Sequence, residues 1–260
     1  MAMIRSVRGM VVLVTGGASG LGRATIERLT QQGARAILLD VPTSEGETIA
    51  KSIGKDCIWA PADVTSEAEV QRSVSLAQQK FGRLDVVVNC AGIAVAVKTF
   101  NFSKKVPHSL EYFQRILQVN AVGTFNVIRL AAGEMAKNEA DADGHRGVIV
   151  NTASVAAFDG QIGQAAYSAS KGAIVGMTLP IARDLSPQGI RVVTIAPGIF
   201  ATPMVNSLPE KVRTFLARQV PFPCRLGDPS EYAHLVQSIV ENPMLNGEVI
   251  RLDGAIRMQP

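Results

Sequence analysis

The sequence contains few residues of the kinds that build metal centres and disulfide frameworks. Its three cysteines, Cys57, Cys90 and Cys224, include no C-x-x-C pair, and its three histidines are scattered. The odd count and the spacing predict reduced thiols in an intracellular protein and no metal site. No apolar run approaches the length that a helix needs to cross a bilayer, so we expect no membrane span.

The sequence also lacks a strong excess of charge of either sign. The formal net charge is +4, and lysine and arginine are spread along the chain. The nearest approach to a basic cluster is Lys98, Lys104 and Lys105, for which a solvated loop is the favoured interpretation. This pattern does not predict a nucleic-acid surface. The first 26 residues carry arginines but no acid, which permits mitochondrial import, yet they form no long amphipathic presequence.

Short apolar runs alternate with helical patterns along the whole chain. This alternation predicts an α/β fold: one domain, residues 1–260, with a doubly wound parallel sheet and helices on both faces. Pro180 falls inside the helical pattern that begins near Tyr167, so we expect it to kink or interrupt that helix. The seven expected strands are residues 10–15, 36–40, 57–60, 85–90, 147–152, 190–196 and 248–252.

A glycine-rich turn, Thr15 to Gly22, follows the first apolar run and precedes a helical pattern. Free backbone N–H groups and the helix dipole make such a turn a site for a pyrophosphate. The spacing G-x3-G-x-G is weak on its own. The residues expected to contact the nucleotide here are Gly16, Ser19, Gly20, Leu21 and Gly22.

Asp40 ends the second apolar run, 18 residues after Gly22. A carboxylate there can accept both hydroxyls of an adenosine ribose and repels the 2′-phosphate of NADP. Ser19 and Val41, where a compensating basic residue would stand, are uncharged. We therefore expect NAD as the cofactor; the alternative for Asp40 is an aspartate that merely ends a strand.

Tyr167 and Lys171 stand four residues apart in a helical stretch, so their side chains leave the same face. A neighbouring ammonium is expected to lower the pKa of the phenol, which is ordinarily about 10, toward the range of a general acid/base. Ser154 ends a buried apolar run and is placed to hold a substrate oxygen while Tyr167 moves the proton. The alternative is that Tyr167 and Lys171 are an ordinary surface pair.

Together these features resemble the short-chain dehydrogenase/reductase family, from about Met10 to Arg257. The resemblance implies a Rossmann fold with strand order 3-2-1-4-5-6-7 and the catalytic set Asn120, Ser154, Tyr167 and Lys171. Its N-N-A-G element is present with Cys90 in place of the second asparagine. The resemblance also implies that Asn120 anchors a water leading to Lys171. Further cofactor contacts that it implies are Asp63, Val64, Asn89, Ala91, Gly92, Tyr167, Lys171, Pro197, Gly198 and Thr202.

Four longer stretches, the last of them residues 252–260, are most similar to a mitochondrial branch of this family. That likeness implies an NAD-dependent homotetramer that oxidises short straight and branched 3-hydroxyacyl-CoA thioesters and also accepts steroid alcohols. It implies localisation in the mitochondrial matrix, with the cytoplasm as the fallback. It further implies a subunit role beside a tRNA methyltransferase in a tRNA-processing complex.

Three segments are expected to form the substrate pocket: residues 93–109, 138–147 and 198–227. Loops beyond the carboxyl ends of parallel strands build such crevices. Gln161 and Gln164 are candidate polar contacts, beside Ser154 and Tyr167. Apolar residues of the third segment suit a fatty or steroid-like substrate, or else simply pack this lid on the core; they are Phe200, Met204, Leu208, Phe215, Leu216 and Phe222.

Three classes of function fit these observations. The leading class is an NAD-dependent dehydrogenase; the others are a catalytically idle scaffold for RNA processing and a nucleotide-sensing regulator. A scaffold or a regulator without any catalytic activity is disfavoured, because an idle site has no need of the complete set Ser154, Tyr167, Lys171 and Asn120.

Overall fold

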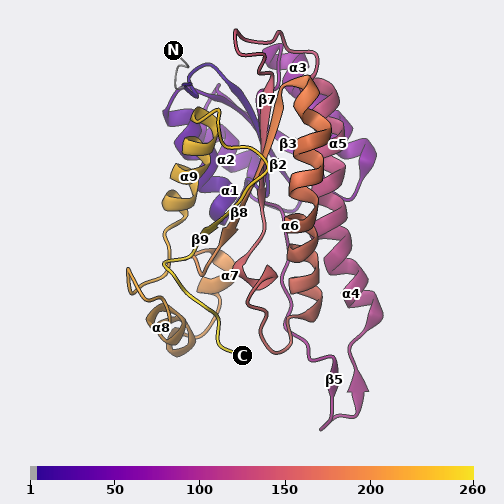
Figure 1. The fold of residues 1–260 in the computed structure, drawn as a ribbon, viewed down its shortest axis with the longest axis vertical. Helices are drawn as coiled ribbons and strands as arrows, with labels where there is room; N and C mark the ends of the chain where they lie inside the picture. Colours follow the sequence, from indigo (N-terminus) through magenta and orange to yellow (C-terminus); the bar gives the residue numbers. More distant parts are fainter. Residues whose placement is uncertain (1–4) are drawn as a thin grey trace.

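The computed structural model describes residues 5–260 and is built around one seven-stranded parallel sheet (Figure 1). Its strand order, β3-β2-β1-β4-β7-β8-β9, is the predicted order, and every neighbouring pair is parallel. The strands are β1 (Val11–Thr15), β2 (Arg35–Asp40), β3 (Cys57–Pro61), β4 (Val86–Asn89), β7 (Gly147–Thr152), β8 (Ile190–Pro197) and β9 (Val249–Leu252).

The central strands are apolar along their whole length because helices cover both faces of the sheet. All residues of β1, β4, β7 and β8 are buried. One face packs against α1 (Gly20–Gln31), α2 (Gly46–Ile53) and α9 (Pro229–Glu241). The other packs against α3 (Glu67–Phe81), α5 (Thr124–Met135) and α6 (Ala165–Leu185), with α4 (Leu110–Leu117) beside α6. The predicted Rossmann architecture is thus confirmed.

The remaining short elements lie mostly near the carboxyl ends of the strands (Figure 1). They are the hairpin β5 (Phe100–Asn101) and β6 (Val106–Pro107), the π-helix η1 (Gln118–Gly123), the 3-10 turns η2 (Val155–Ala157) and η3 (Ser186–Gln188), α7 (Pro203–Asn206) and α8 (Glu210–Arg218). The hairpin β5–β6, which projects from the body, has no counterpart in the sequence prediction, because two-residue strands carry no periodic signal.

The interruption expected at Pro180 is wrong, since α6 runs through it to Leu185. Proline removes one backbone donor and leaves the carbonyl four residues earlier, that of Gly176, without its partner. Both Pro180 and Gly176 lie on the exposed face of α6, where water can bond this carbonyl. The helix is held from its other face, where Ile174, Thr178 and Ile181 are buried.

No helix among residues 5–260 combines the length and apolar character needed to span a bilayer. The parallel arrangement brings the ends of β1, β2, β4, β7 and β8 to one edge of the sheet. Thr15, Asp40, Asn89, Thr152 and Pro197 end these strands. Whatever follows these residues is therefore gathered at that edge.

Candidate active site

The turn between β1 and α1 presents the amino end of a helix to the strand edge. Ser19 is the N-cap residue, but its side chain caps no backbone N–H. The N–H groups of the first helical turn have no partner within the helix. Gly22 packs so tightly on the carbonyl of Gly16 that a Cβ atom would overlap it. This unblocked, positively polarised end fits a pyrophosphate.

Asp40 lies at the end of β2, beside that turn. Its Oδ2 accepts a hydrogen bond from the backbone N–H of Ala18 (2.9 Å), and its Oδ1 accepts one from Val41 (2.8 Å). These bonds fix the carboxylate at the rim of the turn. Two arginines that are close in sequence have other partners: Arg23 pairs with Glu27 at 2.7 Å, and the guanidinium of Arg35 lies 4.9 Å from the ring centroid of Phe81.

Most of the other residues predicted to contact the cofactor stand along the same strand edge. Asp63 accepts hydrogen bonds from the backbone and the hydroxyl of Thr65, both at 2.8 Å, which tightens the loop after β3. Ala91 donates its backbone N–H to the hydroxyl of Thr15 at 3.1 Å, so the segment after β4 is tied to β1. Asn89 differs: its side chain is buried between strands and donates to Asn151 Oδ1 at 2.9 Å.

Ser154 and the pair Tyr167 and Lys171 come together from β7 and α6. Ser154 caps the turn η2, and its Oγ accepts the N–H of Ala156 at 3.1 Å. The Nζ atom of Lys171 lies 5.8 Å from the ring centroid of Tyr167. It donates to the carbonyl oxygen of Thr152 at 2.8 Å and is buried. The alternative of an exposed surface pair is therefore wrong.

Burial dominates the electrostatics of this pair. It raises the pKa of Tyr167, and the neighbouring Ser154 hydroxyl opposes part of that rise. It lowers the pKa of Lys171 to about 8, because the ammonium loses its water. The expected lowering of the Tyr167 pKa by Lys171 is not seen in this structure, since a helical spacing does not reveal how strongly the surrounding protein desolvates the phenol.

Asn120 is fully buried in the π-helix η1, a kind of local bulge that often occurs at functional sites. Its Oδ1 accepts the N–H of Ile93 (2.8 Å), and its Nδ2 donates to the carbonyl of Ile93 (2.9 Å) and to Ser170 Oγ (3.0 Å). Asn120 thereby fixes Ile93 and Ser170. Its role as the anchor of a water stays a prediction.

One cavity of about 660 Å³ joins the two halves of this site. It is lined by the glycine turn and Asp40 at one end and by Ser154, Tyr167 and Lys171 at the other. The predicted site residues outside the lining are Asn89 and Asn120. The remaining predicted residues that line it are Asp63, Val64, Ala91, Gly92, Gln161, Gln164, Pro197, Gly198 and Thr202.

The three expected substrate segments contribute unequally to this cavity. Ile93 to Ala96 line it, as do Phe200, Met204 and Leu216, whereas Leu208, Phe215 and Phe222 do not. Segment 138–147 does not line it either, so its assignment to the pocket is not supported. This segment precedes β7 and so lies at the amino ends of the strands, where Asn138 bonds the carbonyls of Leu84 and Arg146.

Sequence reasoning missed several lining residues. Arg115 on α4 and Met258 near the carboxyl terminus both line the cavity, as do Thr152 and Cys90. Cys90 could have been predicted to line the cavity, because it directly precedes Ala91, a predicted cofactor contact. No sequence signal marked Arg115 and Met258, because only the tertiary fold brings them to this edge.

A second cavity, of about 670 Å³, lies beside the first. Gln161 and Gln164 line both, and Lys98, Phe100, Phe102 and Ser168 line only the second. Lys104 and Lys105 line neither; they lie in the exposed turn between β5 and β6.

All three cysteines are free thiols. Across the described part of the chain, no three His, Cys, Asp or Glu side chains are grouped so as to hold a metal ion.

The geometry agrees with what comparison with known proteins finds. The sequence model of the short chain dehydrogenase family matches residues 10–213. The 3-hydroxyacyl-CoA dehydrogenase type-2 of Bos taurus is 71% identical over 259 residues, which cover 100% of this chain and 99% of that protein.

Two solved structures show the same fold. The crystal structure of 3-hydroxyacyl-CoA dehydrogenase type-2 from Mycobacterium avium superposes with a TM-score of 0.93 at 40% identity, covering 97% of each chain. That of 3-ketoacyl-(acyl-carrier-protein) reductase from Brucella melitensis, complexed with NADH, superposes with a TM-score of 0.85 at 30% identity; it covers 97% of this chain and 100% of the other.

Proposed function

Because this chain belongs to the short-chain dehydrogenase/reductase family and is an oxidoreductase that uses a nicotinamide cofactor, we propose that it oxidises 3-hydroxyacyl-CoA thioesters with NAD. Short and branched acyl chains are the proposed main substrates, and hydroxysteroids are secondary ones. The observation that carries the substrate proposal is the 71% identity, over essentially the whole of both chains, with an enzyme of that name.

The choice of NAD over NADP rests on charge at the rim of the glycine turn. The Asp40 carboxylate is held there by the backbone of Ala18 and Val41. A 2′-phosphate would meet this negative charge, and neither Arg23 nor Arg35 is free to compensate it. Two ribose hydroxyls, by contrast, can donate to the carboxylate.

The proposed chemistry uses groups that the cavity brings together. NAD, when bound against the glycine turn, supplies a hydride acceptor. Ser154 Oγ holds the substrate oxygen, and the phenolate oxygen of Tyr167 accepts the hydroxyl proton. Burial raises the pKa of Tyr167, so its phenolate depends on the Ser154 hydroxyl, which opposes that rise, and on the positive charge of Lys171. The Lys171 pKa of about 8 lets this lysine exchange protons near neutral pH.

The pocket walls fit an acyl chain with a polar thioester. Phe200, Met204 and Leu216 supply apolar surface, and Gln161 and Gln164 supply amide groups. The two glutamines are linked: Gln164 Oε1 accepts the backbone N–H of Gln161 at 3.2 Å. Gln161 and Gln164 line both cavities, so their amide groups could bond the part of a substrate that extends from one cavity into the other.

The test is NADH formation from a panel of 3-hydroxyacyl-CoAs and hydroxysteroids at matched concentrations. We expect the highest kcat/KM for a short 3-hydroxyacyl-CoA. Higher values for every steroid would reverse the proposed order of substrates. Tight NAD binding without turnover of any of them would favour the nucleotide-sensing regulator.

We also propose that the chain forms a homotetramer in the mitochondrial matrix, as its resemblance to the mitochondrial branch implies. Large apolar side chains of α4, η1 and α5 remain exposed in the single chain, among them Leu110, Tyr112, Val122 and Phe125. A single chain rarely leaves such a group uncovered. Light scattering would give four times the mass of one chain, and a monomer would refute the assembly; fractionation of cells would test the compartment.

The likeness to the mitochondrial branch supports one more proposal, a scaffold role in tRNA processing that coexists with the enzyme. Such a role would depend on the outer surface and not on the Tyr167 hydroxyl inside the cavity. A tRNA methyltransferase partner should therefore be stimulated equally by the wild type and by Tyr167→Phe. Absence of stimulation by the wild type would remove this role.

A further inference from the structure

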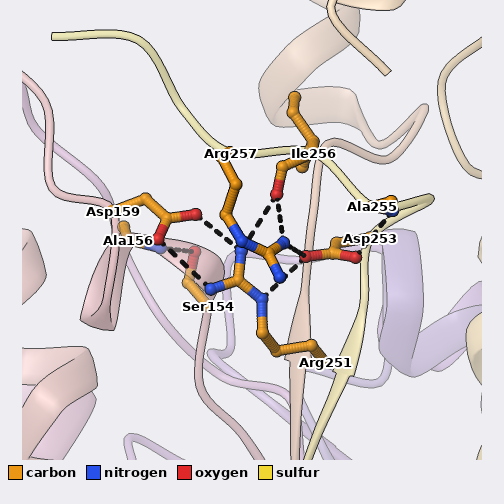
Figure 2. Close-up of polar contacts among 8 residues, drawn as sticks. All are labelled: Ser154, Ala156, Asp159, Arg251, Asp253, Ala255, Ile256 and Arg257. Carbon is orange, nitrogen blue, oxygen red and sulfur yellow. Dashed lines mark hydrogen bonds and ion pairs between the residues drawn. The ribbon is translucent and has the colours of Figure 1, made fainter. Parts of the chain in front are cut away.

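Arg251, in the last strand β9, lies at the centre of a polar cluster (Figure 2). Its Nη1 and Nη2 donate to the two carboxylate oxygens of Asp159 at 3.2 and 2.5 Å. Its Nε donates to Asp253 Oδ2 at 2.7 Å, and Nη2 also reaches the carbonyl of Ile256 at 3.0 Å. The guanidinium thus bonds the turn at Asp159 and the stretch 253–256 directly, and another segment, the loop after β8, packs on Asp253. The side chain of Arg251 is only 22% exposed.

The first of these segments is the turn that follows Ser154. Asp159 donates its backbone N–H to the carbonyl of Val155 at 2.8 Å, and Ala157 bonds the carbonyl of Ser154 at 3.0 Å. Asp159 therefore closes the turn whose first residue is Ser154. It is also the only charged residue between Ser154 and Lys171. The ion pair with Arg251 is the one charged attachment of this turn to the sheet.

The second segment is the loop after β8. Gly198 donates its N–H to the carbonyl of Leu252 at 2.9 Å. It packs so closely on Asp253 that a Cβ atom at position 198 would lie 2.9 Å from the Cα of Asp253. Asp253 is held in turn by Arg251 and, at 3.2 Å, by Arg257. The position of Gly198, which lines the cavity, therefore depends on the place of Asp253.

The third segment is the end of the chain. The carbonyl of Ile256 accepts from Arg251, and Met258, two residues later, lines the cavity. Gln161 Nε2 donates to the carbonyl of Gln259 at 2.8 Å, so this end also touches a candidate substrate contact. The guanidinium of Arg251 lies 5.3 Å from the ring centroid of Phe158, which closes the cluster on the side of the Ser154 turn.

We propose that Arg251 is a positioning residue of the active site: through Asp159 it fixes the turn that carries Ser154, and through Asp253 and Ile256 it fixes the part of the cavity wall that contains Gly198 and Met258. A bidentate ion pair with charge-assisted hydrogen bonds suits this task, because it restrains orientation as well as distance. This proposal rests on the dehydrogenase function proposed above.

The expected consequence is a loss in turnover and not in nucleotide binding. A displacement of a catalytic group by about 1 Å can cost about 100-fold in rate. Among the predicted cofactor contacts only Gly198 packs on this cluster, whereas the glycine turn and Asp40 have no bond to it. The KM for NAD should therefore change by about twofold or less. Loss of an ion pair that only stabilises the fold would not lower kcat selectively while leaving the KM for NAD nearly unchanged.

The test compares Arg251→Met, Asp159→Asn, their combination and Arg251→Lys with the wild type. We expect each of the first two to lower kcat about 10- to 100-fold, and the double variant to be no worse than Arg251→Met, since one interaction is lost in all three. Arg251→Lys should recover part of the loss. If Arg251→Met does not fold, Asp159→Asn still removes the ion pair while keeping the shape of the side chain.

Arg83→Met is the matched control. Arg83 makes a comparable bidentate pair with Asp85 at 2.7 and 2.9 Å, just before β4 and so at the far end of the sheet. This variant should lower the thermal midpoint yet keep kcat within about twofold. Amide hydrogen exchange of residues 154–160, measured without cofactor, should accelerate in Arg251→Met and Asp159→Asn but not in Arg83→Met.

Wild-type kcat in Arg251→Met or in Asp159→Asn would overturn the proposal, as would unchanged exchange in residues 154–160. An equal loss of kcat in Arg83→Met would show that general destabilisation is the cause. If the wild type itself oxidises no 3-hydroxyacyl-CoA, the proposed function fails, and the exchange measurement alone decides whether Arg251 holds the Ser154 turn.

Discussion

The ammonium nitrogen of Lys171 lies 5.8 Å from the ring centroid of Tyr167 and donates a hydrogen bond to the carbonyl oxygen of Thr152 at 2.8 Å. The end of β7 therefore fixes the lysine, and the phenol is left open to the cavity. The arrangement places a desolvated positive charge beside the proton acceptor. It also has a cost in stability, because the charge has lost its water.

This cost gives a pH-dependent prediction. The pKa of Lys171 is about 8 in the folded chain and 10.5 ordinarily. Between these values the unfolded chain binds a proton that the folded chain has released, so stability rises with pH across this window. The penalty is fully present below pH 8 and fades toward pH 10.5.

Lys171→Met should therefore raise the free energy of unfolding at pH 7 by about 2 kcal/mol, after about 1 kcal/mol is subtracted for the lost hydrogen bond to Thr152. The gain should shrink at about pH 10, where the folded lysine is already neutral. Urea unfolding without cofactor at both pH values measures this, with the exposed Lys51→Met as control. An equal gain at both pH values would contradict a buried, titrating Lys171.

A second prediction concerns the cofactor. Asp40→Ser should raise the ratio of kcat/KM for NADP to that for NAD about 10- to 100-fold, as expected from removing about 1–3 kcal/mol of charge repulsion. Asp40→Asn, which loses the charge but keeps an amide oxygen, should give much of the same change. Steady-state rates with both cofactors decide this. A ratio that stays at the wild-type value in both variants would refute the role of Asp40.

A third prediction concerns coenzyme A. Lys98 lines the second cavity, whereas Lys104 and Lys105 point into solvent at the hairpin turn. Neutralising all three should raise the KM for a 3-hydroxyacyl-CoA about fivefold, since an exposed charge pair contributes up to about 1 kcal/mol. Lys98→Met alone should account for most of this rise, with Lys104→Met as its control.

The KM for a neutral hydroxysteroid should hardly change in these variants, because it carries no phosphate. If both substrates are affected equally, the lysines form an ordinary solvated loop.

The fold and the centre of the site could be predicted from the sequence because local signals carry them. Alternating apolar runs and right-handed crossovers predict the parallel sheet, and the family resemblance implies its strand order. The glycine turn and Asp40 follow or end neighbouring strands. Parallel strands then bring these residues and Ser154 to one edge without further information.

What could not be predicted depends on burial and long-range packing. The Tyr167–Lys171 spacing gave the shared helix face but not the depth that raises one pKa and lowers the other. The Arg251–Asp159 pair joins residues 92 positions apart, and no local pattern marks it. The assignment of segment 138–147 to the pocket is not supported for another reason: the segment leads into β7, which puts it at the amino ends of the strands.

The central claim is that Tyr167 accepts the proton when this chain oxidises a 3-hydroxyacyl-CoA with NAD. The most direct measurement is the rate of NADH formation from one short 3-hydroxyacyl-CoA by the wild type and by Tyr167→Phe, with NADH affinity measured separately by fluorescence. Removing a general base typically costs about 10²–10⁴-fold. We predict a loss of kcat in that range with NADH affinity within about twofold, whereas a loss of less than about tenfold would show that another group takes the proton.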